Sequence, residues 1–72
     1  MGKLNDPFTV LVEKDAEGYF VATVPELRGC HTQAKSLDVL MRRVREEIAL
    51  CLADEKRPAH RTFVGVQQVR LA

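Results

Sequence analysis

Residues 18–33 read Gly-Tyr-Phe-Val-Ala-Thr-Val-Pro-Glu-Leu-Arg-Gly-Cys-His-Thr-Gln, and this stretch decides the fold. Residues 19–24 are rich in aromatic and β-branched side chains, which favours a strand. Pro25 ends that strand because it has no N–H to donate to a ladder. Gly29 closes a short turn, and residues 30–33 form a second, shorter candidate strand. The stretch therefore predicts two strands joined by a turn that Pro25 opens and Gly29 closes.

The residues before this stretch predict its hairpin partner. Residues 8–13 form another run of β-branched and aromatic residues, which favours a strand. The polar residues 14–17 lead to Gly18, which can take a positive φ without steric cost and so suits a hairpin loop. Strands joined by so short a loop are expected to pair antiparallel. Residues 1–6 are polar, and we expect them to fray.

The residues after this stretch predict one amphipathic helix. Ser36 is a good N-cap, and Asp38 places a favourable charge in the first turn. The helix is expected to end before Pro58. Arg43 and Glu47 stand four residues apart and are expected to pair on the outer side, as are Arg42 and Glu46. The apolar residues have helical spacing and form one stripe: Leu37, Leu40, Met41, Val44, Ile48, Cys51 and Leu52.

Residues 61–71 predict a last strand, in which Gly65 marks a bulge or a close backbone approach. The element order is then βββαβ, and the fold class is α+β. A right-handed crossover places the last strand beside the first. We therefore predict a single domain over residues 1–72, with two layers: a four-stranded mixed sheet in the order 3-2-1-4 and one helix on one face.

The second face of that sheet is expected to be apolar and uncovered. The strand at 8–13 carries Val10 and Val12 on one face and Leu11 on the other, and the strand at 19–24 is also apolar on both faces. One helix covers only one side of a sheet. Exposed apolar area of this kind indicates a partner surface, and we predict a homodimer or a dimer of dimers.

Composition argues against a secreted disulfide-rich protein and against a membrane-spanning one. The chain has 72 residues, a net charge of +1 and two cysteines, which is too few for a secreted disulfide scaffold. Residues 1–6 lack the apolar run of a signal peptide, and no stretch approaches the ~20 apolar residues of a membrane span. We therefore expect a reduced cytoplasmic protein without a membrane segment.

The potential metal ligands and catalytic residues do not form a recognisable motif in the sequence. Cys30 and His31 are neighbours on a strand and point to opposite faces, so they cannot easily share a metal ion or act as nucleophile and base. Cys30 and Cys51 are expected to be buried and to behave as small hydrophobic residues. Glu13 is the only carboxylate within a predicted strand, which is too little for a magnesium nuclease. We predict no enzyme activity, no metal and no cofactor.

Nucleic-acid binding is the disfavoured alternative. The basic residues of the helix and the segment after it form a potential patch, but acidic residues interleave with them and the aromatic residues lie on predicted strands. A solvated, salt-bridged helix face is the better account. The basic residues concerned are Arg42, Arg43, Arg45, Lys56, Arg57, His60 and Arg61.

Residues 18–33 resemble the HicB antitoxin family. Its members show a glycine, an aromatic residue and alternating strand residues, followed by Pro-Glu-Leu, one residue, Gly-Cys and a short polar run. The resemblance covers nearly the whole chain after Asn5. It implies a partial ribonuclease H-like fold and a partner of the HicA type, a small toxin that cuts messenger RNA. Family members usually carry a DNA-binding module after this domain; this chain stops at Ala72, so we do not expect operon regulation through DNA.

The resemblance and the turn chemistry together point to one partner-binding loop. Pro25 and Gly29 hold the backbone, so Glu26, Leu27 and Arg28 are presented at low entropic cost. Leu27 is expected to be the apolar anchor and Arg28 the polar contact, with Tyr19 extending the patch. In the structural alternative the loop only joins two strands, and Leu27 lies in the core.

These observations leave three functions open. The first is a HicB-like antitoxin-type domain that associates with itself and masks a toxin. The alternatives are a small RNA-binding regulator and a homo-oligomeric domain without a toxin partner.

Overall fold

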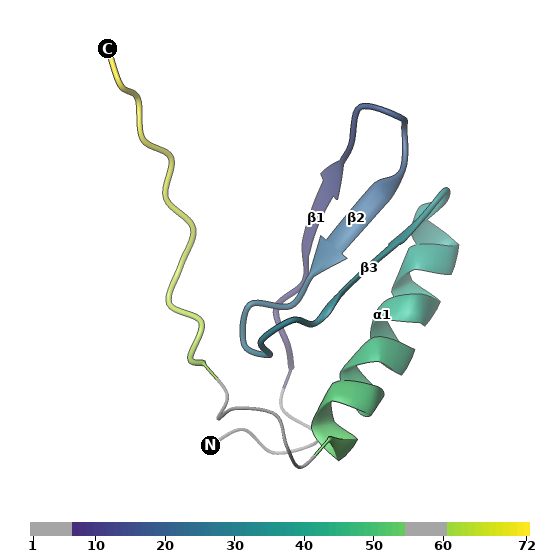
Figure 1. Cartoon of the computed structure of the whole chain (residues 1–72). Helices are drawn as coiled ribbons and strands as arrows, with labels where there is room; N and C mark the ends of the chain where they lie inside the picture. The colour runs from purple at the N-terminus through teal and green to yellow at the C-terminus, as the bar shows by residue number, and fades with distance from the viewer. Residues whose placement is uncertain (1–6, 55–60) are drawn as a thin grey trace.

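The computed structural model describes residues 7–54 and 61–72, and it shows three strands followed by one helix (Figure 1). The fold class is α+β, as the sequence predicts. The prediction that residues 1–6 fray lies outside the described residues, as does Pro58. Within the described part of the chain, no helix combines the length and the apolar character that crossing a membrane requires. The elements are β1 (Leu11–Lys14), β2 (Phe20–Thr23), β3 (His31–Ala34) and α1 (Leu37–Ala53).

The hairpin of β1 and β2 forms as expected. The two strands pair antiparallel, with Leu11 opposite Thr23 and Lys14 opposite Phe20. Asp15 fixes the loop, because its Oδ1 accepts hydrogen bonds of 2.9 Å from the N–H groups of both Glu17 and Tyr19. Gly18 has φ +90°, the left-handed conformation that its lack of Cβ permits.

The turn between β2 and β3 is also built from local hydrogen bonds. Leu27 N–H donates to the Val24 carbonyl, and Cys30 N–H donates to the Leu27 carbonyl, both at 3.1 Å. Val24 N–H closes the turn by donating to the Cys30 carbonyl at 2.9 Å. Gly29 takes φ +72°, which few other residues adopt without strain. β3 then pairs antiparallel with β2, and the sheet order is β1-β2-β3.

Helix α1 begins where its cap residue predicts. The Ser36 hydroxyl accepts a hydrogen bond from Val39 N–H at 3.3 Å, and Asp38 lies in the first turn. α1 packs against β3 and β2 on one face of the sheet (Figure 1). Between helix and sheet lies a small core, in which Leu40 is fully buried. Its buried members are Ala22, Val24, Leu27, Cys30, Ala34, Leu40, Val44 and Cys51.

The fourth strand is not seen, and the sheet order 3-2-1-4 is therefore not shown. Residues 61–72, which we call the C-terminal segment, form no strand and run apart from the sheet (Figure 1). A physical reason lies in the helix, which packs on β3 and β2. On β1, Val12 remains 44% exposed. A strand added outside β1 would lie beyond this helix and bury little apolar surface within one copy.

The open face of the sheet is less apolar than the sequence suggests. Strand alternation and register place Leu11 and Val21 on the side away from α1, and both are half-buried. The same face carries four polar residues: Glu13, Thr23, His31 and Gln33. The larger exposed apolar surface is on the C-terminal segment instead.

Candidate functional site

The predicted partner loop is a structural junction. Leu27 is only 4% exposed and belongs to the core, as in the structural alternative. The Glu26 carboxylate accepts hydrogen bonds from the N–H of Thr9, at 3.0 Å and 3.3 Å to its two oxygens. The Glu26 carbonyl accepts a hydrogen bond of 2.8 Å from the N–H of Arg61. The loop thus connects the chain before β1, the core and the C-terminal segment.

The other two predicted partner residues lie at opposite ends of β2. Arg28 is exposed on the loop, whereas Tyr19 precedes β2 at the hairpin end, where Lys35 Nζ lies 5.5 Å from the centre of its ring. At about 3.3 Å per residue, the five steps from Tyr19 to Val24 span roughly 16 Å. The structure therefore does not bring Tyr19 together with Glu26, Leu27 and Arg28 in one patch.

The C-terminal segment exposes large apolar side chains. Val64 and Leu71 are 94% and 98% exposed, and Val66 and Val69 are 65% and 81% exposed. Neither the segment's own backbone nor the residues near it cover these four side chains. Exposed apolar side chains gathered on one segment make it a candidate interaction surface.

A shallow apolar groove lies beside the last turns of α1. Its volume is about 460 Å³, and its lining is Phe8, Arg45, Ile48, Ala49, Leu52 and Ala53. Phe8 comes from the chain that leads into β1, so the groove runs between that chain and the helix. Nothing in its lining supplies a set of polar groups for a small ligand.

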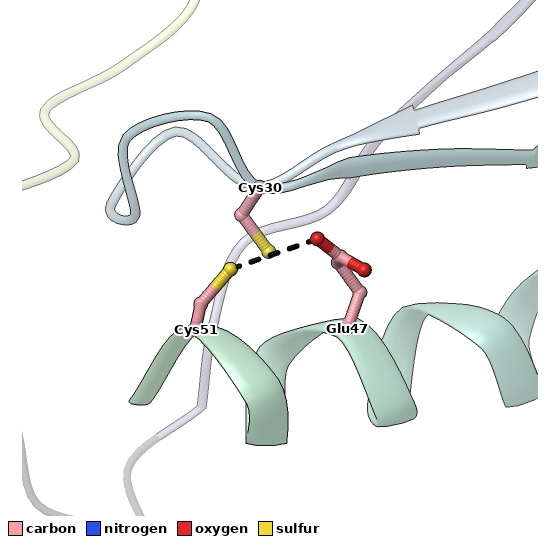
Figure 2. Close-up of side chains that lie close together, drawn as sticks. All are labelled: Cys30, Glu47 and Cys51. Atoms are coloured by element: carbon pink, nitrogen blue, oxygen red, sulfur yellow. Dashed lines mark hydrogen bonds between the residues drawn. The ribbon is translucent and has the colours of Figure 1, made fainter. Parts of the chain in front are cut away.

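Three potential metal ligands meet beneath the β2–β3 turn. Figure 2 shows the Cys30 side chain pointing from the turn toward α1, where Cys51 and Glu47 point back toward it. Their donor atoms all lie within 4.8 Å of one another. The Cys51 thiol donates to Glu47 Oε2 at 3.8 Å. Cys30 and Cys51 are 1% and 3% exposed, Glu47 is half-buried, and neither thiol is in a disulfide.

Sequence reasoning missed this cluster because it compared Cys30 only with its neighbours along the chain. The burial of both cysteines is confirmed. The predicted pairing of Glu47 with Arg43 is wrong, because Glu47 faces Cys51 and Arg43 Nη1 donates to the Gln33 carbonyl at 2.8 Å. The available signal was spacing: Glu47 lies four residues before Cys51, on the buried stripe of the helix.

The proposed basic patch is only partly described. Lys56, Arg57 and His60 lie outside the described residues. Arg42 and Arg45 are exposed on α1, and the guanidinium of Arg43 binds a backbone carbonyl. The helix itself, Leu37–Ala53, carries no aromatic side chain beside them.

Comparison with known proteins identifies close relatives. No family model matches the chain. A UPF0150 protein of Archaeoglobus fulgidus is 53% identical over 64 residues, which cover 89% of this chain and 93% of that protein. A UPF0150 protein of Synechocystis is 39% identical over 62 residues, covering 86% and 90% of the two chains. A Helicobacter pylori relative with the same family name is 48% identical over 44 residues, 61% of this chain and 60% of its own length. With such identity over most of both chains, this protein belongs to the UPF0150 family.

Proposed function

We propose that this chain is a HicB-like, antitoxin-type binding domain that associates with itself and masks a protein partner, a HicA-type toxin that cuts messenger RNA. The observation that carries self-association is the C-terminal segment with its four exposed apolar side chains. The resemblance of residues 18–33 to HicB antitoxins supports the toxin partner. A cytoplasmic location is part of the same proposal, since messenger RNA is cut there.

The C-terminal segment has the pattern of a strand that is covered on both faces. Val64 and Val66 share one face of an extended chain, and Val69 and Leu71 share the other. Burying each of these side chains stabilises an assembly by roughly 1.5–3 kcal/mol. One sheet face cannot bury both pairs, so a neighbour must contribute to the cover.

The receiving surface in this proposal is the outer edge of β1. Among the described residues β1 pairs only with β2, so its other edge has unpaired backbone groups. The C-terminal segment of a second copy would add a fourth strand there, which is β-strand addition between two copies. Exchange in both directions closes a symmetric dimer and restores the sheet order 3-2-1-4 within it.

The toxin-binding surface is proposed at the exposed part of the β2–β3 turn. Arg28 is exposed there, and the buried Leu27 together with Glu26 holds the turn in place. The contribution of Tyr19 would have to come from a separate contact at the hairpin end.

Sedimentation of the full chain tests self-association. We expect a dimer or tetramer at micromolar concentration rather than the 8.1 kDa monomer. The double variant Val64→Asp/Val69→Asp should shift the protein to monomer with an unchanged helical circular dichroism signal. Gln67→Asp/Gln68→Asp, which adds the same two charges to the same segment, is the matched control and should stay assembled. A monomeric parent protein would contradict the proposal.

Co-expression with a HicA-type toxin tests the partner. We expect the parent chain to restore growth and to form a complex with the purified toxin, and Arg28→Ala to weaken that complex without changing self-association. A chain that assembles with itself but neither protects cells nor binds the toxin is the homo-oligomeric alternative.

A further inference from the structure

We propose that Cys30, Glu47 and Cys51 form a binding site for one thiophilic divalent cation, with Zn²⁺ as the expected ion. The site lies between the β2–β3 turn and the inner face of α1, on the buried side of the turn whose exposed part carries the proposed toxin contact (Figure 2).

The separations of the donor atoms suit a tetrahedral ion after a small contraction. With Zn–S bonds of about 2.3 Å, two sulfur ligands lie about 3.8 Å apart, and a sulfur and a carboxylate oxygen about 3.6 Å apart. Here the three donor atoms lie within 4.8 Å of one another, and Cys51 Sγ is 3.8 Å from Glu47 Oε2. Side-chain rotations that move each donor atom by about 1 Å or less would bring the three atoms to these separations.

The backbone already holds the three ligands in place. Cys30 is fixed on both sides, since its N–H donates to the Leu27 carbonyl and its carbonyl accepts from Val24 N–H. Glu47 and Cys51 stand one turn apart on the same helix, and neighbours at this spacing point in the same direction. Such preorganisation lowers the entropic cost of binding an ion.

The ligand types select the class of metal. Two thiolates favour zinc over magnesium or calcium, which prefer oxygen ligands. On binding, the two thiol protons leave to solvent, and the ion meets two thiolates and one carboxylate. Three protein ligands leave a fourth position open for water or for a group of another molecule.

The position of Glu47 distinguishes a metal site from an apolar core. The helix stripe that packs on the sheet has Leu40, Val44 and Cys51 buried, and Glu47 stands on it between Val44 and Cys51. A purely structural core favours an apolar residue at such a position. A carboxylate that faces two buried thiols completes a set of three metal ligands. The prediction that both cysteines are only small buried residues does not explain why a carboxylate stands at this position.

Cobalt spectroscopy on the reduced full chain tests the proposal directly. Co²⁺ bound to two thiolates in a tetrahedral site gives a sulfur-to-metal charge-transfer band and strong visible absorption. We expect both at one ion per chain, with Zn²⁺ displacing Co²⁺ and raising the melting temperature by several degrees. Absence of both the spectrum and the thermal shift would overturn the proposal.

Variants locate the site. Cys30→Ser and Cys51→Ser should each abolish stoichiometric binding. Glu47→Gln should weaken Co²⁺ binding by more than about ten-fold, the loss that even an outer-shell partner can cause. Glu46→Gln removes an exposed carboxylate of the same helix and should leave the affinity unchanged. If the serine variants do not fold, the comparison of Co²⁺ affinity between Glu47→Gln and Glu46→Gln still tests the site.

Two other outcomes would contradict the proposal. Equal Co²⁺ affinity in the Glu47→Gln and Glu46→Gln variants would place the ion elsewhere. Failure of the reduced protein to bind Co²⁺, combined with a Cys30–Cys51 disulfide formed by glutathione disulfide, would identify the cluster as a redox pair.

Discussion

Replacing Leu40 with alanine should destabilise this protein more than any equivalent change on the exposed side of its helix. Leu40 is 0% exposed and belongs to the core, which has eight buried members among the residues that the structure describes. The change removes three carbon atoms from a buried site, worth about 0.8 kcal/mol each, or roughly 2.4 kcal/mol. The cavity left behind raises the expected cost to about 3–5 kcal/mol.

The expected loss is large relative to the stability of a domain of this size. At about 0.05–0.15 kcal/mol per residue, 72 residues give an unfolding free energy of roughly 4–11 kcal/mol. Leu40→Ala should therefore remove between about a quarter and all of the stability. Urea unfolding followed by the helical circular dichroism signal measures this loss as a lower midpoint with an unchanged slope.

Leu50 supplies the matched control on the same helix. It is 68% exposed, so Leu50→Ala makes the same chemical change with little apolar burial to lose. We expect its effect to stay within about 0.5 kcal/mol, as for other surface changes. Equal unfolding midpoints for the two variants would refute the helix phase and the core derived from it.

Three further changes probe the local structure by urea unfolding. Ser36→Ala removes the cap that accepts Val39 N–H and should cost about 1 kcal/mol, whereas Ser36→Asp should retain it. Gly29→Ala forces a side chain into φ +72° and should cost about 1–2 kcal/mol; no measurable loss would mean that the turn differs. Asp15→Ala removes the acceptor of two loop N–H groups and should cost about 1 kcal/mol, with Asp15→Asn intermediate.

Local signals in the sequence were sufficient to predict the three strands and the helix that the structure shows. The Ser36 cap, the Gly18 loop and the turn between Pro25 and Gly29 act over a few residues, and each appears where its residues predict. A strand at residues 61–71 would depend on a distant edge for its hydrogen bonds. Its β-branched residues favour an extended chain but do not specify which edge such a chain would pair with, and the predicted fourth strand is not seen in the structure.

The candidate sites show the same limit. Cys30 and Cys51 were each identified as buried, but their meeting depends on how α1 lies across β3, which no local pattern specifies. Glu47 was assigned to the outer side because an arginine stands four residues before it. Glu47 also stands four residues before Cys51, a spacing at which two helical side chains are neighbours. In the structure Glu47 contacts Cys51.

The β2–β3 turn links the two proposals in physical terms. Glu26 in this turn holds the start of the C-terminal segment through its carbonyl and the chain before β1 through its carboxylate. Cys30 ends the same turn and would tie it to the last turns of α1 through the ion. An ion that fixes Cys30 would therefore also hold the turn to which Arg61, at the start of the C-terminal segment, is hydrogen-bonded, and a segment with fewer orientations loses less entropy when it pairs with a second copy. Metal binding and self-association are thus expected to strengthen each other, since coupling between two binding events is reciprocal.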